Sequence, residues 1–197
     1  MTIREVKGNK REYLPLLLLA DEQESMIELY LDRGTMFLLE IDGVPAAECV
    51  VTDEGGGVLE IQNLAVAPEQ QGKGYGRELI DFLRGRYRGR YRELQVGTGD
   101  SPLTVPFYEH CGFVRHHVLK NYIVEHYDHP IFEGGRQLID KICLRMPLQR
   151  RPAESQKNDP RIRRSGDRFA KTRNAYCSRT SSVRRLRSTT ACSMSST

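Results

Sequence analysis

The chain has 197 residues, of which 39% are hydrophobic, so it is long enough for one domain with a real core and too short for two ordinary domains. Its formal charge of +4 is unevenly distributed: residues 150–197 hold 13 Lys/Arg and 3 Asp/Glu, whereas residues 1–149 hold 17 and 23. The excess of positive charge therefore belongs to the C-terminal part and does not indicate a nucleic-acid surface on the rest of the chain.

Cysteine usage and hydropathy exclude several further classes of protein. The five cysteines are scattered and form no CxxC pair, which is typical of reduced thiols and not of a disulfide framework or a zinc site. No apolar run approaches the roughly 20 residues that span a bilayer, and the N-terminal segment lacks a signal-peptide core. We therefore expect a cytoplasmic protein with no metal and no membrane association.

The first third of the chain predicts a strand, two helices and an antiparallel meander. Thr2–Val6 alternates polar and apolar side chains like a short strand, and Lys10–Ala20 carries leucines at helical spacing. Glu22–Leu31 repeats the helical pattern and is followed by Arg33-Gly34, a typical helix end. Three apolar runs joined by glycine turns then predict the meander: Met36–Ile41, Pro45–Thr52 and Val58–Val66.

The middle of the chain alternates helices and strands. A glycine-rich stretch leads into an amphipathic helix over Arg77–Tyr87. The remaining expected elements are two strands around a short helix, an aromatic and acidic insertion, and a last strand: Glu93–Val96, Leu103–His110, Gly112–Val118, Tyr122–Gly135 and Asp140–Met146. This order predicts an α+β fold, a mixed sheet with helices against it.

The C-terminal part differs in character from the rest. Residues 150–197 have almost no periodic apolar face and are rich in Arg, Ser and Thr, so they lack the apolar area that offsets chain entropy. We predict one folded domain over residues 1–149 and a basic, disordered tail over residues 150–197.

One segment has the composition of a phosphate site. A strand ending in Leu64-Ala65-Val66 is followed by the loop Gln71-Gly72-Lys73-Gly74-Tyr75-Gly76 and then by the amphipathic helix. Free N–H groups and the dipole at a helix N-terminus attract an anion, glycines allow close approach, and Lys73 and Arg77 add positive charge. No Gly-Lys-Ser/Thr follows, so this is not a Walker loop, and the antiparallel meander fits a dinucleotide site poorly. The alternative is a simple glycine-rich turn.

These residues carry a resemblance to a known family. Leu64-Ala65-Val66-x-Pro68-x-x-Gln71-Gly72-Lys73-Gly74-Tyr75-Gly76 is similar to the coenzyme-binding motif of the GNAT N-acetyltransferases. Phe107-Tyr108-Glu109-x-Cys111-Gly112-Phe113 resembles that family's Tyr-x-x-x-Gly-Phe segment. The resemblance covers about residues 2–148. It implies the GNAT fold, with a mostly antiparallel twisted sheet flanked by helices, and acetyl-CoA as co-substrate.

The resemblance also implies which residues hold the coenzyme. They are Leu64, Ala65, Val66, Gln71, Gly72, Lys73, Gly74, Tyr75, Gly76 and Arg77. Ser101 stands where many relatives carry an Asn that helps to hold the coenzyme, and its hydroxyl could partly replace that amide.

Acetyl transfer to an amine needs a base and an acid. The amine arrives as an ammonium without a lone pair, so a base must take a proton, and the departing thiolate benefits from an acid. Glu60 lies four residues before Leu64 on the same strand, where several GNAT relatives carry a Glu, and is the candidate base, directly or through water. Tyr108 resembles the family's tyrosine near the thiol and is therefore the candidate acid. Backbone N–H groups of Leu64–Val66 could stabilise the oxyanion if this strand is bulged and its neighbour diverges. The alternatives are a solvated carboxylate at Glu60 and a packing aromatic at Tyr108.

The insertion Tyr122–Gly135 is the candidate acceptor entrance. It mixes negative charge with aromatic rings, which suits a cationic amine. The residues concerned are Glu125, Asp128, Glu133, Tyr122, Tyr127 and Phe132. We therefore predict direct acetyl transfer to the primary amine of a small cationic molecule, without nucleic-acid partners. The aromatics could instead pack the loop or a homodimer interface. An inactive acyl-CoA-binding regulatory module and a protein N-acetyltransferase stay as alternative functions.

Overall fold

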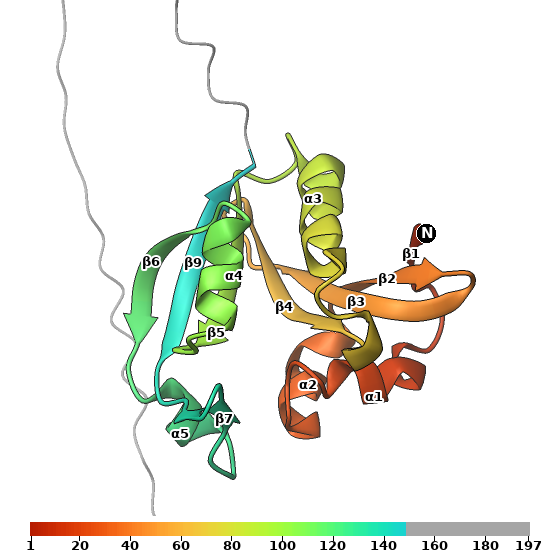
Figure 1. Cartoon of the computed structure of the whole chain (residues 1–197). Helices are drawn as coiled ribbons and strands as arrows, with labels where there is room; N and C mark the ends of the chain where they lie inside the picture. The colour runs from red at the N-terminus through yellow and green to blue at the C-terminus, as the bar shows by residue number, and fades with distance from the viewer. Residues whose placement is uncertain (149–197) are drawn as a thin grey trace, which may run out of the picture. The chain divides into compact units, whose positions relative to one another are not determined.

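The computed structural model describes residues 1–148, so the tail predicted for residues 150–197 lies outside the described residues. Residues 1–148 form a seven-stranded sheet in the order β1-β2-β3-β4-β5-β9-β6, flanked by helices (Figure 1). Each neighbouring pair is antiparallel except β4 and β5, which are parallel. The expected α+β class with a mostly antiparallel sheet is confirmed.

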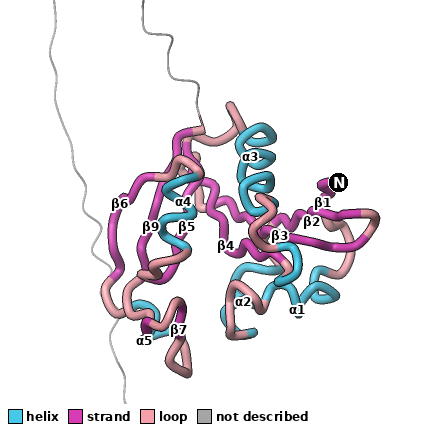
Figure 2. Tube along the Cα trace, in the orientation of Figure 1, coloured by secondary structure: helices cyan, strands magenta, loops and turns pink. Residues whose placement is uncertain are grey.

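Figure 2 separates the elements by type, and their bounds are as follows. The strands of the large sheet are β1 (Thr2–Glu5), β2 (Thr35–Ile41), β3 (Val44–Asp53), β4 (Val58–Val66), β5 (Glu93–Gly99), β6 (Val114–Leu119) and β9 (Lys141–Pro147). The α-helices are α1 (Leu14–Leu17), α2 (Glu24–Leu31), α3 (Tyr75–Tyr87), α4 (Thr104–His110) and α5 (Tyr122–His126). Two 3₁₀ turns, η1 (Lys10–Tyr13) and η2 (Pro68–Gln70), and a two-stranded ladder, β7 (Phe132–Glu133) with β8 (Arg136–Gln137), complete the set.

One segment differs from the sequence-based expectation, and another has structure for which the sequence made no prediction. The helix expected over Lys10–Ala20 forms as the turn η1 followed by the single turn α1. Pro15 has no backbone N–H and therefore fits only the first turn of a helix, which sets the start of α1 at Leu14. The insertion after β6 contains α5 and the β7–β8 ladder, and it has its own small core of Ile123, Ile131 and Leu138.

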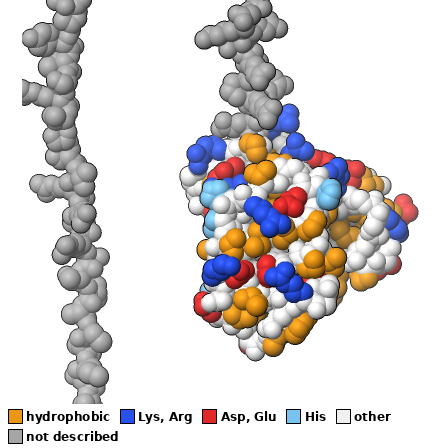
Figure 3. Space-filling model, turned by 60° about the vertical axis from the view of Figure 1, so that its left-hand side comes forward, with side chains coloured by type: hydrophobic (Ala, Val, Ile, Leu, Met, Phe, Trp, Pro, Cys, Tyr) orange, Lys and Arg blue, Asp and Glu red, His pale blue; other side chains and the backbone are white. Residues whose placement is uncertain are grey.

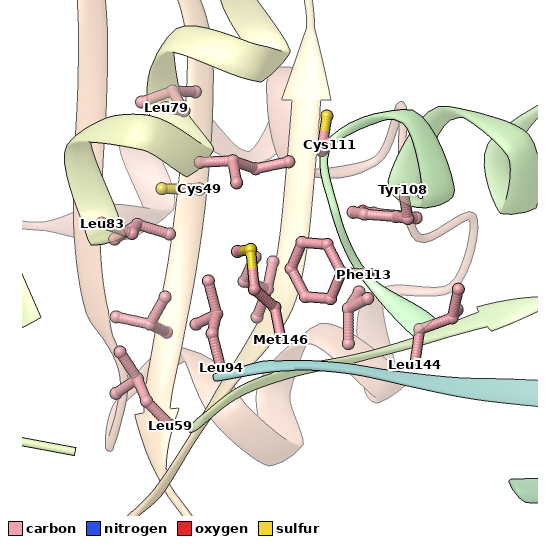
Figure 4. Close-up of a cluster of buried hydrophobic side chains, with 14 of the residues drawn as sticks. Cys49, Leu59, Leu79, Leu83, Leu94, Tyr108, Cys111, Phe113, Leu144 and Met146 are labelled. Atoms are coloured by element: carbon pink, nitrogen blue, oxygen red, sulfur yellow. The ribbon is translucent and has the colours of Figure 1, made fainter. Parts of the chain in front are cut away.

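Helices cover both faces of the sheet. The residues of β2 alternate between the two faces, so Phe37 and Leu39 pack with α3 and α4 while Met36 and Leu38 pack with α1 and α2. Figure 4 shows the first of these cores, with Leu79 and Leu83 of α3 facing Leu94 and Met146 of the strands. Each fully buried leucine of this kind contributes about 1.5–3 kcal/mol relative to an exposed one. These two cores hold the strands around which the site forms.

A bulge and a divergence follow each other along β4. Val50 of β3 pairs with Asn63, whereas Val51 pairs with Ile61, so Gln62 is an extra residue in β4. β4 pairs with β5 only from Val58 to Ile61, and beyond Ile61 the two strands separate (Figure 1). The two features that the oxyanion argument required, a bulged strand and a diverging neighbour, are both present beside Leu64–Val66.

The edge strand β6 is exposed. Val114 and Val118 are 64% and 44% exposed, and the rings of His116 and His117 contact each other with their Nδ1 atoms 2.6 Å apart. Figure 3 turns this side of the molecule forward and shows apolar, basic, acidic and histidine side chains interspersed on it.

Within residues 1–148, no three His, Cys, Asp or Glu side chains are grouped so that they could hold a metal ion. The helices of this part of the chain are also too short or too polar to cross a bilayer.

Candidate active site

A cleft of about 1050 Å³ opens where β4 and β5 separate. Its walls are the end of β4, the loop into α3, the end of β5, α4, the insertion and the connection between α1 and α2. It brings together most of the residues that the sequence singled out: Glu60, Leu64, Ala65, Val66, Gln71, Gly72, Gly74, Tyr75, Gly76, Arg77 and Tyr108. Lys73 and Ser101 are not part of its lining.

The glycine-rich loop has the backbone that an anion site needs. Gly72 and Gly74 have φ of 74° and 88°, which is the left-handed region, and a Cβ at either position would meet nothing within 4 Å. Gly74 is the N-cap of the 13-residue helix α3, and no side chain caps this end. The first-turn N–H groups of α3 are therefore available to a ligand. Gly76 serves packing, since its Cβ would lie 3.1 Å from the ring of Phe107 in α4.

The two basic residues of the loop have different surroundings. Arg77 lines the cleft, and its guanidinium donates a hydrogen bond to the carbonyl of His110 at the end of α4. Lys73 is exposed, and its ammonium donates to Gln70 Oε1 over 2.9 Å. Arg77 therefore adds positive charge directly to the cleft wall, whereas Lys73 lies outside the lining.

Ser101 has a structural role that the sequence did not indicate. It is 3% exposed, and its Oγ accepts hydrogen bonds from the backbone N–H groups of Leu103 and Thr104 at 2.9 and 3.1 Å. The hydroxyl thus holds the start of α4, and the structure does not bring it to the cleft. A serine side chain is too short to hold the start of α4 and also reach a ligand in the cleft, because its oxygen stays close to its own backbone.

Glu60 is held in a polar array that crosses three strands. It is 8% exposed, its Oε2 accepts a hydrogen bond from Gln95 Nε2 at 2.8 Å, and its Oε1 lies 3.8 Å from Lys141 Nζ. Gln95 Oε1 in turn accepts from Arg145 Nε at 2.8 Å. Glu60 is therefore an oriented carboxylate on the cleft wall, and the alternative of a freely solvated side chain does not describe it.

Tyr108 both packs in the core and reaches the cleft. Its ring makes edge contacts with Phe107 and Phe113, with centroids 5.1 and 5.6 Å apart, and Figure 4 shows it beside Phe113. Its hydroxyl is protonated at neutral pH, and burial raises its pKa still further above the usual value. Both readings of Tyr108 from sequence, packing aromatic and proton donor, fit this position.

A hydrogen-bonded chain that sequence reasoning missed borders the cleft. Asn63 Nδ2 donates to Tyr30 Oη at 2.8 Å, Tyr30 donates to Asp21 Oδ2 at 3.3 Å, and Tyr127 donates to Asp21 Oδ1 at 3.0 Å. Asp21 is 8% exposed, and burial raises its pKa. These hydrogen bonds connect the bulge of β4 with the insertion. No motif marks them, because the residues come from four separate segments.

The insertion contributes only part of its predicted acceptor residues to the cleft. Tyr122, Tyr127, Phe132 and Glu133 line it, whereas Glu125 and Asp128 do not. Glu133 Oε2 accepts a hydrogen bond from Thr104 Oγ1 at 3.3 Å, which connects the insertion to α4. Lys141 at the start of β9 lies on the same side of the cleft and was not predicted.

Comparison with known proteins identifies the family. Residues 32–115 match the model of the acetyltransferase (GNAT) domain. The chain is 31% identical over 139 residues to the uncharacterized N-acetyltransferase YvbK of Bacillus subtilis (strain 168), and the match covers 70% of this chain and 90% of that protein.

Solved structures of similar proteins agree. A GNAT family acetyltransferase from Elizabethkingia anophelis with acetyl-CoA bound is 30% identical, has a TM-score of 0.71, and matches over 74% of this chain and 97% of its own. A Bacillus subtilis acetyltransferase in complex with CoA is 29% identical, has a TM-score of 0.68, and matches over 74% and 97%. The chain belongs to the GNAT family and is an N-acetyltransferase.

Proposed function

We propose that the enzyme transfers the acetyl group of acetyl-CoA directly to the primary amine of a small cationic molecule bound in the cleft. One observation carries this proposal: the glycine-rich loop, Glu60, Tyr108 and several carboxylates line the same cleft of about 1050 Å³. The acetyl-CoA and CoA bound to the relatives from Elizabethkingia anophelis and Bacillus subtilis support the choice of donor.

The residues of the loop fit the coenzyme. Gly72 and Gly74 present open backbone at positive φ, the N-terminus of α3 has no side-chain cap, and Arg77 adds a guanidinium. These groups would hold the phosphates, and the backbone of Leu64–Val66 would pair with the extended arm in the gap beside β5. Acetyl-CoA supplies an acetyl group activated as a thioester. Lys73 and Ser101 would have at most an indirect part in holding it.

Two side chains would move the protons. Glu60 would take the proton of the acceptor ammonium, and the hydrogen bond from Gln95 to Oε2 orients the carboxylate for this. Tyr108 lines the cleft and, like any tyrosine, carries its proton at neutral pH, so it would supply one to the departing sulfur. An acetyl-enzyme on Cys111 is disfavoured, because this thiol does not line the cleft and burial raises its pKa.

The charge of the cleft favours a cationic acceptor. Among the described residues, four carboxylates line it, from Asp21, Glu22, Glu60 and Glu133, against three cationic side chains, from Arg33, Arg77 and Lys141. Arg77 belongs to the glycine-rich loop end, so the rest of the lining has an excess of negative charge, which raises the local concentration of cations. The aromatic rings of Tyr122, Tyr127 and Phe132 on the same wall can pack on the carbon skeleton of the acceptor or on its cation.

The proposal is tested by following free thiol release from acetyl-CoA with a panel of small amines. Glu60→Gln and Tyr108→Phe should each lower kcat by roughly 10²–10⁴-fold while acetyl-CoA binding is unchanged. Glu109→Gln, which alters an exposed carboxylate beside Tyr108 in the sequence, is the matched control and should keep wild-type activity. Wild-type turnover in both variants, or acetylation of peptides with no small amine accepted, would contradict the proposal.

A further inference from the structure

Lys141 places an ammonium group on the acceptor side of the cleft. Its side chain is 21% exposed and lines the cleft. Among residues 1–148 it has two close polar contacts, with Glu60 Oε1 at 3.8 Å and with the centre of the Tyr122 ring at 4.9 Å, and neither is a hydrogen bond. The three N–H donors of this ammonium are therefore available to a ligand.

The pairing of β9 with β5, and the space over Gly97, fix the position of the Lys141 side chain. Lys141 pairs with Gly99 across the β5–β9 ladder, and a Cβ on Gly97 would lie 1.9 Å from Lys141 Cε and 2.8 Å from Nζ. The lysine stem therefore lies flat across β5 over Gly97, from β9 toward Glu60 on β4. Gly97 does not have a positive φ, so its lack of a side chain matters here for the space it leaves.

The acidic groups near Lys141 accept no hydrogen bond from its ammonium group. Both oxygens of Asp21 accept hydrogen bonds from tyrosine hydroxyls, and Glu60 Oε2 accepts one from Gln95. The remaining oxygen, Glu60 Oε1, is 3.8 Å from Nζ, which is too far for a hydrogen bond. The Lys141 ammonium thus has an ion-pair contact with Glu60 and a cation–π contact with Tyr122, and neither uses its N–H donors in a hydrogen bond, so these can bind a ligand.

We propose that Lys141 binds a carboxylate of the acceptor, so that the acceptors are small amines carrying a carboxylate next to the reactive amine. This inference rests on the proposed transfer to small amines at the same cleft. An α-amino acid holds its two charged groups on one carbon, so its amine can lie at Glu60 while its carboxylate lies at Lys141. A basic side chain on that amino acid would keep the acceptor cationic, in agreement with the carboxylates of Asp21 and Glu133 on the wall.

The test compares amines that differ only in the carboxylate. Three pairs serve as probes: L-ornithine and putrescine, L-lysine and cadaverine, and L-phenylalanine and phenethylamine. The wild-type enzyme should have a higher kcat/KM for the carboxylate member of at least one pair. Lys141→Met should lower that value by roughly 10- to 100-fold, as expected for a lost charge-assisted hydrogen bond, and should change the value for the decarboxylated amine much less.

Three further variants control this experiment. Gly97→Ala keeps the lysine but fills the space in which the Lys141 side chain lies. It should therefore also lower kcat/KM selectively for the amines that carry a carboxylate. Lys141→Arg should retain part of the preference. Lys120→Met removes an exposed lysine that pairs with Asp140 outside the cleft and should leave all values unchanged. Melting temperature and acetyl-CoA affinity of each variant establish that it is folded.

The outcomes separate this inference from the proposed function. Turnover of the decarboxylated amines alone, or an equal loss for both members of a pair in Lys141→Met, would overturn the carboxylate site and leave acetyl transfer to small amines standing. An equal loss would mean that Lys141 acts only by supporting Glu60. Absence of turnover with all six amines would overturn the proposed acceptor class and the carboxylate site together.

Discussion

Glu48 in the middle of β3 is a fully buried carboxyl group without a hydrogen-bond partner for either oxygen among residues 1–148. It lies opposite Ala65 of β4, next to the strand segment assigned to the coenzyme. Burial raises its pKa to about 8, so it carries a proton at neutral pH. A buried acid of this kind lowers stability wherever the unfolded chain would release the proton.

Replacing Glu48 by glutamine should therefore change how stability depends on pH. The pKa of Glu48 is raised in the folded state from an ordinary value of 4.5 to about 8. Between these values the folded protein holds a proton that the unfolded chain has lost, so wild-type stability falls as pH rises through this window. The unfolding free energy of Glu48→Gln should exceed that of the wild type at pH 8 by on the order of a few kcal/mol, and the gap should shrink toward pH 4.5.

Urea denaturation of both proteins at several pH values measures this gap. A difference between the two proteins that is the same at pH 4.5 and pH 8 would mean that Glu48 is not protonated by burial. The comparison is internal, because every other titrating group is common to both proteins.

At the scale of single residues, sequence patterns pointed to those residues of the cleft that lie in short motifs. Glu60 could be chosen because it stands four residues before Leu64 on the same strand, and Tyr108 because it belongs to the segment that ends in Gly112-Phe113. Hydrogen bonds between distant segments could not be predicted: Gln95 is 35 residues from Glu60, and Tyr127 is 106 residues from Asp21. These contacts depend on which strands and loops meet in space. Ser101 shows the opposite case, where a matching position has its hydroxyl engaged by the start of α4.

At the scale of elements, the insertion between β6 and β9 is fastened to the connection between α1 and α2. Tyr127 donates to Asp21, the backbone N–H of Asp128 donates to Gln23 Oε1 at 2.9 Å, and His129 Nε2 lies 3.6 Å from Glu22 Oε2. These contacts join the two sides of the cleft entrance. The order of the insertion, and with it the acceptor pocket, should depend on them.

Tyr127→Phe tests this fastening. It removes the hydroxyl that donates to Asp21 and leaves a buried carboxylate oxygen without that partner, a loss of roughly 1–3 kcal/mol. We expect a lower melting temperature, faster amide hydrogen exchange in α5 and β7, and a higher KM for the acceptor, with acetyl-CoA affinity unchanged. Tyr122→Phe, in the same insertion, keeps the ring that stacks on His126 and should change exchange much less. Equal exchange in wild type and Tyr127→Phe would contradict the fastening.

Elements whose apolar residues recur with a clear period could be predicted from the sequence, whereas departures from that period could not. The alternation of β2 and the amphipathic pattern of α3 follow directly from the residues that pack in the cores. The bulge at Gln62 could not be seen, because one extra residue in a mixed polar and apolar strand leaves no distinctive pattern. The first helix was predicted too long, because the leucine spacing was given more importance than Pro15.

At the scale of the whole molecule, the described domain consists of two sets of strands that share a short parallel pairing. β1 to β4 form one set and β5, β9 and β6 the other, and they meet only through Val58–Ile61 and Glu93–Val96. The cleft is a consequence of this separation, so the fold itself creates the site. The order of elements along the chain could be predicted, whereas the insertion of β9 between β5 and β6 could not, because long-range packing decides strand pairing.

Isothermal titration with acetyl-CoA measures most directly whether the Gln71–Gly76 loop holds the coenzyme. The proteins to compare are the wild type, Gly74→Val and Gly85→Ala. A valine at 74 places a branched side chain on the open face of the loop at φ of 88°, whereas an alanine at 85 lies within α3 and meets nothing within 4 Å. Wild type and Gly85→Ala should bind with similar affinity, and Gly74→Val should bind at least roughly tenfold more weakly while its unliganded form still melts cooperatively. Equal affinity in all three proteins would contradict the assignment of the loop.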